Sequence, residues 1–207
     1  KTSTARIIAR ALNCIGEDSN GGPTPESCGV CAHCKAITGD RHVDVIEMDA
    51  ASRTGVNDIR ELIDGVRYRP VDARFKIYII DEVHMLSSSA FNALLKTLEE
   101  PPEHVKFILC TTEPQKVLAT IQSRCQRFDF KPIPRRLILE HLRFIIAQEG
   151  VEMDDAALGR VAELGNGSMR DALSVMDRVL AGGDTNISLE ALEEMLGLPE
   201  AGLINAV

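Results

Sequence analysis

Two adjacent carboxylates, Asp81 and Glu82, are the residues of this chain whose type and position most clearly suggest chemistry. They directly follow the apolar, β-branched run of residues 75–80, which predicts a fully buried parallel strand. In open α/β sheets, ligands bind beyond the carboxyl ends of the strands. The pair is therefore placed to handle a metal-bound phosphate, although an Asp at a strand end can also simply cap the next helix.

The chain begins with Lys1 and Thr2, directly before a segment with helical spacing. In a phosphate-binding loop, Lys reaches the β/γ-phosphate oxygens and Thr or Ser holds Mg²⁺ at the start of a helix. The glycines of such a loop are not among the residues given, and a lone Lys-Thr pair is more typical of an exposed polar surface. Followed by a buried strand that ends in Asp-Glu, however, the pair indicates a P-loop ATPase. Asp81 would then hold Mg²⁺ through water, and Glu82 would orient and deprotonate the attacking water.

Cysteine spacing gives an independent signal of a metal site. Two overlapping Cys-x-x-Cys steps and one more distant thiol come from Cys14, Cys28, Cys31 and Cys34. Four thiolates form a closed tetrahedral zinc site with no position for water activation, so the expected Zn²⁺ is structural. Disulfides are the alternative, and they are rare in cytosolic proteins. His33 and His42 are possible substitute ligands, but a surface position is expected for both.

Two further segments fit an ATPase. Thr111 and Thr112 end a second buried run, where a hydroxyl could sense the γ-phosphate or simply form an ordinary strand-end hydrogen bond. Arg124 follows a short helical segment, and it is either a surface charge or a finger that reaches the nucleotide of an adjacent subunit.

The elements that must position these residues alternate between strands and helices, which predicts a parallel sheet covered on both faces. Strands are expected at 43–49, 75–80, 105–110 and 126–130, and helices at 2–13, 57–66, 87–100 and 116–123. Beyond the prolines at 132 and 134 only helices are expected, at 135–149, 154–164, 169–181 and 189–196. This pattern predicts an α/β domain at 1–132 with a zinc module at about 14–34, and an all-helical domain at 133–198.

Composition excludes some classes of function. The 207 residues include 23 basic and 31 acidic side chains, a net charge of −8, which disfavours coating DNA by charge alone. No run approaches the roughly 20 apolar residues that cross a bilayer, and no signal peptide is visible. A cytoplasmic protein without a membrane partner is the expectation.

Three longer motifs, residues 80–86, 92–102 and 123–125, resemble those of the bacterial clamp-loader ATPases. The likeness is greatest to the gamma/tau subunits of the DNA polymerase III holoenzyme, and it runs essentially end to end, including the cysteine insertion and residues 49–53. The resemblance implies an AAA+ ATPase with a P-loop domain, a helical lid and a collar domain. Residues 199–207 would begin the linker to the collar.

The resemblance also implies a role for each residue of the nucleotide site. Lys1 and Thr2 match the end of the Walker A motif, and Asp81 and Glu82 match Walker B. Thr112 matches sensor 1. The implied cofactors are ATP and Mg²⁺, with hydrolysis of ATP to ADP and phosphate.

Two arginines and the cysteines complete these implied roles. Arg124 matches an arginine finger that acts in trans, and Arg170, within residues 167–171, matches sensor 2 of the lid. The four cysteines match the family's structural zinc ligands. The implied partners are other subunits of a hetero-pentamer, the sliding clamp, and primed DNA bound through its backbone.

Alternative functions remain open on the sequence. Residues 81–84 also fit the Asp-Glu-x-His signature of helicases, but 207 residues leave no space for a second motor domain. A non-hydrolysing clamp-loader scaffold is the nearer alternative, although such relatives lose the phosphate loop. A polypeptide limited to these residues is expected to bind nucleotide poorly. A basic stretch that includes Arg53 and Arg60 suggests that helix 57–66 faces DNA phosphates.

Overall fold

The computed structural model describes residues 1–52, 56–183 and 186–198 of the chain. Its contacts divide the chain into two compact units, residues 1–128 and 129–207. The division falls a few residues before the boundary expected at 132. Arg53 and residues 199–207, for which a DNA contact and a linker were expected, lie outside the described residues.

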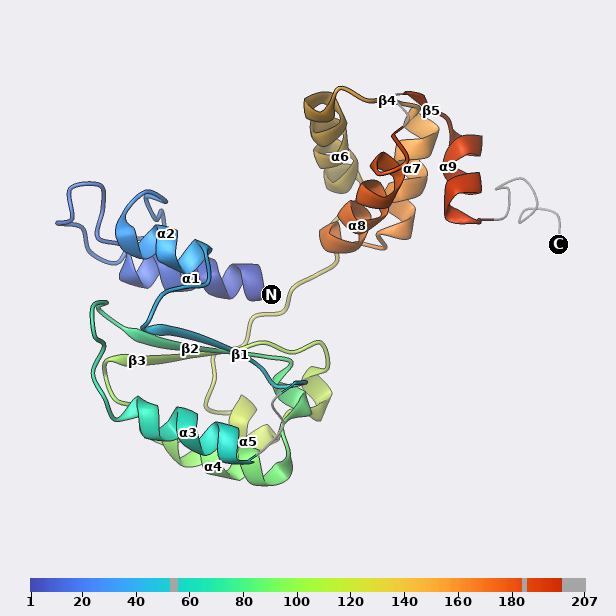
Figure 1. Cartoon of the computed structure of the whole chain (residues 1–207). Coiled ribbons are helices and arrows are strands. Elements are labelled where there is room, and N and C mark those ends of the chain that lie inside the picture. The colour runs from blue at the N-terminus through green and yellow to red at the C-terminus, as the bar shows by residue number, and fades with distance from the viewer. Residues whose placement is uncertain (53–55, 184–185, 199–207) are drawn as a thin grey trace. The chain divides into compact units, whose positions relative to one another are not determined.

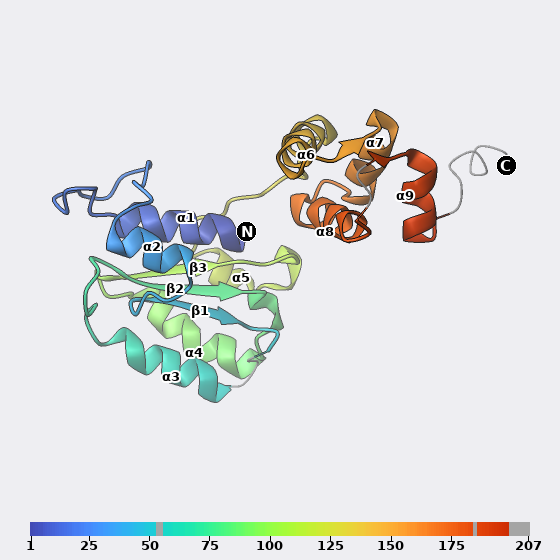
Figure 2. The same ribbon diagram turned by 45° about the horizontal axis from the view of Figure 1, so that its top comes forward.

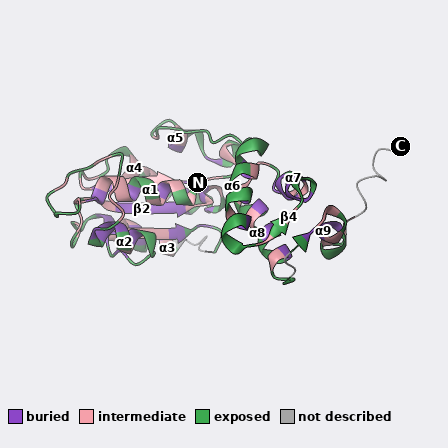
Figure 3. Ribbon diagram, turned by 90° about the horizontal axis from the view of Figure 1, so that it is seen from above, coloured by how far each residue is buried: buried purple, intermediate pink, exposed green. Residues whose placement is uncertain are grey.

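Three parallel strands form the sheet of the first unit, in the order β1-β2-β3 (Figure 1). They are β1 (Val45–Asp49), β2 (Lys76–Asp81) and β3 (Val105–Leu109). The central strand β2 is buried along most of its length (Figure 3), as its continuous apolar run requires. The predicted parallel α/β sheet is therefore confirmed, with strand ends shifted by one or two residues.

Helices cover both faces of this sheet (Figures 1 and 2). One layer holds α1 (Thr2–Asn13) and α2 (Ala32–Thr38), and the other holds α3 (Val56–Val66), α4 (Ser88–Glu99) and the short α5 (Ala119–Gln122). Side chains alternate along a strand, so Ile77 and Ile79 pack toward the α1 layer while Tyr78 and Ile80 pack toward α3 and α4. On α1, the small Ala5 and Ala9 are buried against the sheet.

Two expectations for the first unit are corrected. Residues 126–130 form no strand, and the side chains of Phe128 and Phe130 are 65% and 61% exposed. Their alternating pattern is strand-like, but a strand also needs a neighbouring edge for its backbone hydrogen bonds. The single helix expected at 116–123 is instead a 3-10 turn, η2 (Pro114–Lys116), followed by α5, because Val117 between them is extended.

The second unit packs helices around one apolar core. These helices are α6 (Arg135–Glu149), α7 (Asp155–Leu164), α8 (Met169–Leu180) and α9 (Leu189–Leu196). The expectation of helices alone was wrong, because β4 (Glu152–Met153) and β5 (Asn186–Ile187) form a short parallel ladder. Fully buried Ile187 explains this pairing, since it is drawn into the core from a loop and its backbone needs a hydrogen-bonded neighbour. No helix in the described part of either unit is long and apolar enough to span a membrane.

Candidate functional site

The first residue of α1 and the last residue of β2 meet at the carboxyl edge of the sheet. Here the Thr2 hydroxyl donates a hydrogen bond to a carboxylate oxygen of Asp81. The other oxygen of Asp81 accepts the backbone N–H of Glu82 at 2.9 Å. Lys1 is exposed directly before α1. A hydroxyl and a carboxylate side by side are oxygen donors of the kind that Mg²⁺ binds.

Glu82 turns away from Asp81 toward the end of β3. Its Oε2 accepts the hydroxyl of Thr112 at 2.9 Å and the Thr112 backbone N–H at 3.3 Å. Its backbone is left-handed, with φ of +46°, a conformation that non-glycine residues rarely adopt. Strained backbone of this kind concentrates at functional sites, where the surrounding structure maintains it.

His84 is a site residue that sequence reasoning missed. It lies on the 3-10 turn η1 (Val83–Met85), and its side chain is only 6% exposed. Its Nδ1 lies 2.8 Å from the Thr111 hydroxyl and 3.3 Å from Glu82 Oε2, while its Nε2 lies 3.2 Å from Glu113 Oε2. The available signal was its place two residues after Glu82, which reads equally well as part of a helicase signature.

The two candidate arginines lie in different units of the chain. Arg124 forms an ion pair with Glu99 at 2.6 Å and donates to the backbone carbonyl of Thr120 at 2.6 Å. Arg170 is exposed in the first turn of α8, whose N-terminus is capped by the Ser168 hydroxyl. Of the predicted nucleotide residues, the structure therefore brings together Thr2 with Asp81, and Glu82 with Thr112.

The four cysteines of the predicted zinc site converge. Cys14 follows α1, Cys28 lies in the connecting loop, and Cys31 and Cys34 lie at the start of α2. All four sulfur atoms are within 4.8 Å of one another, and the sulfurs of Cys14 and Cys28 are 3.6 Å apart. Zinc with bonds of about 2.3 Å in a tetrahedron needs sulfurs about 3.8 Å apart. The cluster fits that geometry, and none of its thiols is in a disulfide.

Backbone hydrogen bonds support thiolates in this cluster. Backbone N–H groups point at the sulfurs: that of Cys28 lies 3.4 Å from Cys14 Sγ, and that of Cys34 lies 3.5 Å from Cys31 Sγ. Burial raises the pKa of Cys31, but hydrogen bonds from the backbone of Ile15 and Cys34 lower it to about 6 overall. Burial raises the pKa of Cys34 to about 12. A bound cation is therefore what would keep all four sulfurs deprotonated.

The surface position expected for His33 and His42 was wrong. Both are buried, at 6% and 8% exposure, and His33 Nδ1 lies 2.7 Å from His42 Nε2. His42 also accepts the backbone N–H of Asp44 at 3.0 Å. The two rings thus pair with each other outside the four-cysteine cluster that could hold a metal.

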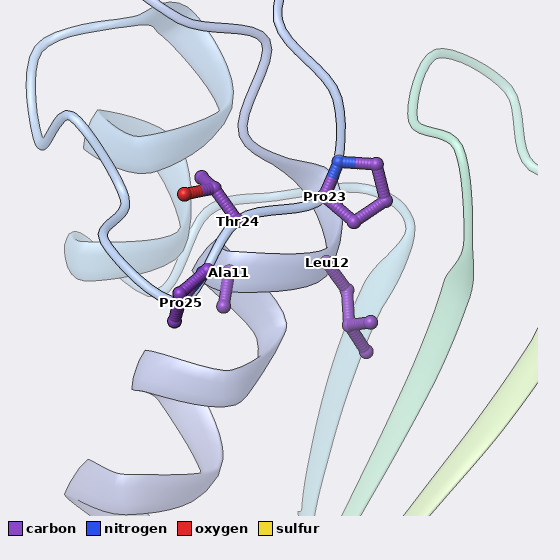
Figure 4. A pocket seen from close by; sticks show the side chains of 5 residues that line it. All are labelled: Ala11, Leu12, Pro23, Thr24 and Pro25. Carbon is purple, nitrogen blue, oxygen red and sulfur yellow. The ribbon is translucent and has the colours of Figure 1, made fainter.

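A shallow hollow lies where the loop of the cysteine module packs on the end of α1 (Figure 4). It is lined by Ala11 and Leu12 of the helix and by residues 23–25 of the loop. The Thr24 N–H donates a hydrogen bond to the Ala11 carbonyl at 2.9 Å, and this bond holds the loop against the helix. The hollow has a mainly apolar lining and holds none of the chemistry described above.

Comparison with known proteins identifies the family. The family described as "DNA polymerase III, delta subunit" matches residues 1–134, and that described as "DNA polymerase III clamp loader subunit, ATPase lid domain" matches residues 137–185. The chain belongs to the DNA polymerase III clamp-loader subunits. The DNA polymerase III subunit tau/gamma of Haemophilus influenzae is 52% identical to this clamp-loader chain over 198 residues, covering 96% of the chain. DNA polymerase III subunit tau of Escherichia coli is 51% identical over 197 residues, covering 95%.

The clamp-loader chain spans 28% and 30% of the length of these two relatives. Among solved structures, the Thermotoga maritima RuvB Holliday junction branch migration motor superposes with a TM-score of 0.60 at 17% identity. That match covers 80% of this chain and 56% of RuvB, and it shows a shared fold. The AAA+ fold and the resemblance to gamma/tau subunits are thus confirmed, while the individual residue roles stay predictions.

Proposed function

We propose that this chain supplies the ATPase part of a clamp-loader subunit, which uses ATP to open the sliding clamp and place it around primed DNA. The observation that carries the proposal is the hydrogen bond between Thr2 and Asp81. It joins the start of α1 to the end of β2 next to Glu82, which is the layout by which P-loop NTPases hold Mg²⁺ between a loop Ser/Thr and a strand-end Asp.

In this proposal, the residues around the Thr2–Asp81 pair bind and orient the triphosphate. Lys1 reaches the β/γ-phosphate oxygens from its exposed position before α1. Thr2 and Asp81 hold Mg²⁺, which supplies positive charge against the phosphate oxygens. The hydrogen bond between Thr2 and Asp81 holds these two side chains together, and proton transfer is left to Glu82.

Glu82 accepts the proton of the attacking water, and Thr112 fixes the glutamate's position through its two hydrogen bonds. Arg124 acts in trans, exchanging its ion pair with Glu99 for the γ-phosphate on an adjacent subunit. Arg170 acts from the lid toward its own subunit's γ-phosphate, where its charge stabilises the transition state.

Zinc holds the module after α1 together in this proposal. A tetrathiolate site has no open coordination position, so the metal would stabilise the module and take no part in hydrolysis. The domain assignment is part of the same proposal, with an ATPase domain at 1–132, a lid at 133–198 and the start of a linker at 199–207.

The proposed partners are the other subunits of a hetero-pentamer, the sliding clamp, and primed DNA in the cytoplasm. Exposed Arg60 on α3, with Arg67 and Arg69 just beyond it, supports sequence-independent contacts to DNA phosphates. Charge reversal at Arg60 is expected to reduce DNA-stimulated hydrolysis, and unchanged stimulation would refute the DNA contact.

Glu82→Gln in the full-length protein, assembled with its partner subunits, tests the proposal. The amide cannot accept the proton of water, so hydrolysis should fall at least about 100-fold while ATP affinity stays within about twofold. Phosphate release and equilibrium binding of labelled ATP measure the two quantities. Hydrolysis at the wild-type rate in the variant would refute the role of Glu82. If hydrolysis by the wild-type complex did not depend on this subunit at all, the scaffold alternative would be favoured.

A further inference from the structure

We propose that His84 is a positioning residue that holds Glu82 in its catalytic position by bridging it to Glu113. The inference rests on the proposed function, in which Glu82 activates water. It concerns a side chain to which the proposed mechanism gives no task.

The geometry around the imidazole carries the inference. Both ring nitrogens of His84 face a carboxylate: Nδ1 lies 3.3 Å from Glu82 Oε2, and Nε2 lies 3.2 Å from Glu113 Oε2. The ring is 6% exposed, whereas the two glutamates are 32% and 36% exposed. With a proton on each nitrogen, the buried ring attracts both partly exposed acids and restricts where either carboxylate can lie.

Glu113 is itself held by a cation. The ammonium group of Lys116 lies 2.8 Å from it, and this hydrogen bond lowers the pKa of Glu113. Glu113 is consequently an ionised carboxylate at neutral pH, and His84 Nε2 faces it at 3.2 Å. This contact fixes the plane of the imidazole and so the direction of Nδ1.

The other side of the ring is fixed by Thr111. Its hydroxyl lies 2.8 Å from His84 Nδ1, and its oxygen also accepts the backbone N–H of Glu113 at 3.0 Å. The end of β3 thus holds Glu82 twice, directly through Thr112 and indirectly through His84.

Glu82 needs such support because of its own backbone. Its backbone is left-handed, with φ of +46°. A non-glycine residue keeps this conformation because its surroundings maintain it and not because it prefers it. The carbonyl of Cys110 on the β3 side accepts the Val83 N–H at 2.9 Å, which fixes the main chain just after Glu82. Both the main chain next to Glu82 and its carboxylate are therefore held by contacts with residues at the end of β3.

The test uses His84→Phe in the full-length protein within its assembled complex, with Met85→Ala on the same 3-10 turn as the control. Phe keeps the ring in its buried position and removes both nitrogens, whereas Met85 is 46% exposed and bonds to Glu82 through its backbone N–H, at 2.8 Å from the Glu82 carbonyl, a bond that Ala keeps. We expect kcat to fall at least tenfold in His84→Phe with the Kd for ATP within twofold of wild type, and no change in Met85→Ala. His84→Gln, which keeps a hydrogen-bonding group, should recover part of the loss.

A double substitution separates positioning from general structural support. If His84 acts through Glu113, adding Glu113→Gln to His84→Phe should lower kcat no further, although Glu113→Gln alone lowers it. Wild-type kcat in His84→Phe, or a weakened ATP affinity at unchanged kcat, would overturn the inference. If His84→Phe does not fold, wild-type kcat in both His84→Gln and Glu113→Gln would overturn it equally. Hydrolysis by Glu82→Gln is measured in parallel. If this variant loses hydrolysis while the His84 variants do not, the inference about His84 fails and the proposed function stands.

Discussion

Replacement of Asp44 should weaken the first unit more than its short side chain suggests. Asp44 lies just before β1 and is fully buried. Its Oδ1 accepts the backbone N–H of Val71 at 2.8 Å, and its Oδ2 accepts those of Asp72 and Ala73 at 2.9 Å. This single carboxylate therefore fixes the loop that leads into β2, the strand that ends at Asp81.

The structure sets the magnitude of the effect. Each hydrogen bond to a charged group contributes about 1.5 kcal/mol or more, so three bonds amount to roughly 4.5 kcal/mol. Val71 and Asp72 are exposed, so water can replace part of the lost bonding. We expect Asp44→Ala to lower the free energy of unfolding by about 3 kcal/mol and Tm by roughly 6–12 °C. Asp44→Asn should cost about half as much, because one oxygen can still accept two of the bonds.

The effect should also depend on pH. Burial raises the pKa of Asp44, but the N–H groups of residues 71–73 lower it below its usual value overall. A carboxylate with a depressed pKa stabilises the fold fully above its unfolded pKa of about 3.9, and this contribution is lost as pH falls through the folded pKa. The difference between wild type and Asp44→Asn should thus be constant from about pH 5 to 7 and shrink below about pH 4.

Urea denaturation followed by circular dichroism across this pH range measures both quantities. Exposed Asp64 on α3 provides a matched control, since Asp64→Asn removes a solvent-exposed charge and should change stability by less than about 0.5 kcal/mol. An Asp44→Ala variant as stable as wild type, or a pH-independent difference, would show that the three backbone bonds do not hold this loop.

Two further predictions concern the zinc module and the second unit. Cys34→Ser should reduce bound zinc, measured by atomic emission, well below one per chain, whereas Cys110→Ser outside the cluster should retain it; full zinc in both would exclude the four-thiolate site. Gly167→Ala should destabilise by at least about 1 kcal/mol more than Gly150→Ala, judged by thermal denaturation. Both glycines have positive φ, but only at Gly167 would a Cβ meet Pro132, at 2.5 Å. Equal losses would show that backbone strain alone sets the cost.

Most elements were readable from the sequence because their signals are local. The apolar run of β2, the helical periodicity of α1 and the prolines after α4 act over a few residues. The Cys-x-x-Cys steps likewise predicted a cluster, since short spacings force sulfurs together. Residues 126–130 have the local pattern of a strand but form none. A strand also needs a neighbouring strand to pair with, and a local sequence pattern does not show whether one is present.

Buried polar residues were harder to anticipate. His33 and His42 were expected at the surface, yet both are buried and each ring is the other's partner, with His33 Nδ1 2.7 Å from His42 Nε2. His84 gave the same difficulty, since a buried histidine is tolerated only where other segments supply partners for both nitrogens. Those partners come from the end of β3 and the loop after it.

The sequence by itself determined which residues could perform the chemistry: Lys1 and Thr2 at the start of a helix, Asp81 and Glu82 at the end of a strand, and a set of thiols at metal-binding spacing. Only the tertiary structure decided which of them meet. Thr2 reaches Asp81 across 79 positions because α1 docks on the sheet through Ala5 and Ala9. Glu82 meets Thr112 because β2 and β3 pair with Ile80 beside Leu109. Helix docking and strand register join distant segments, and no local pattern encodes the resulting atomic contacts.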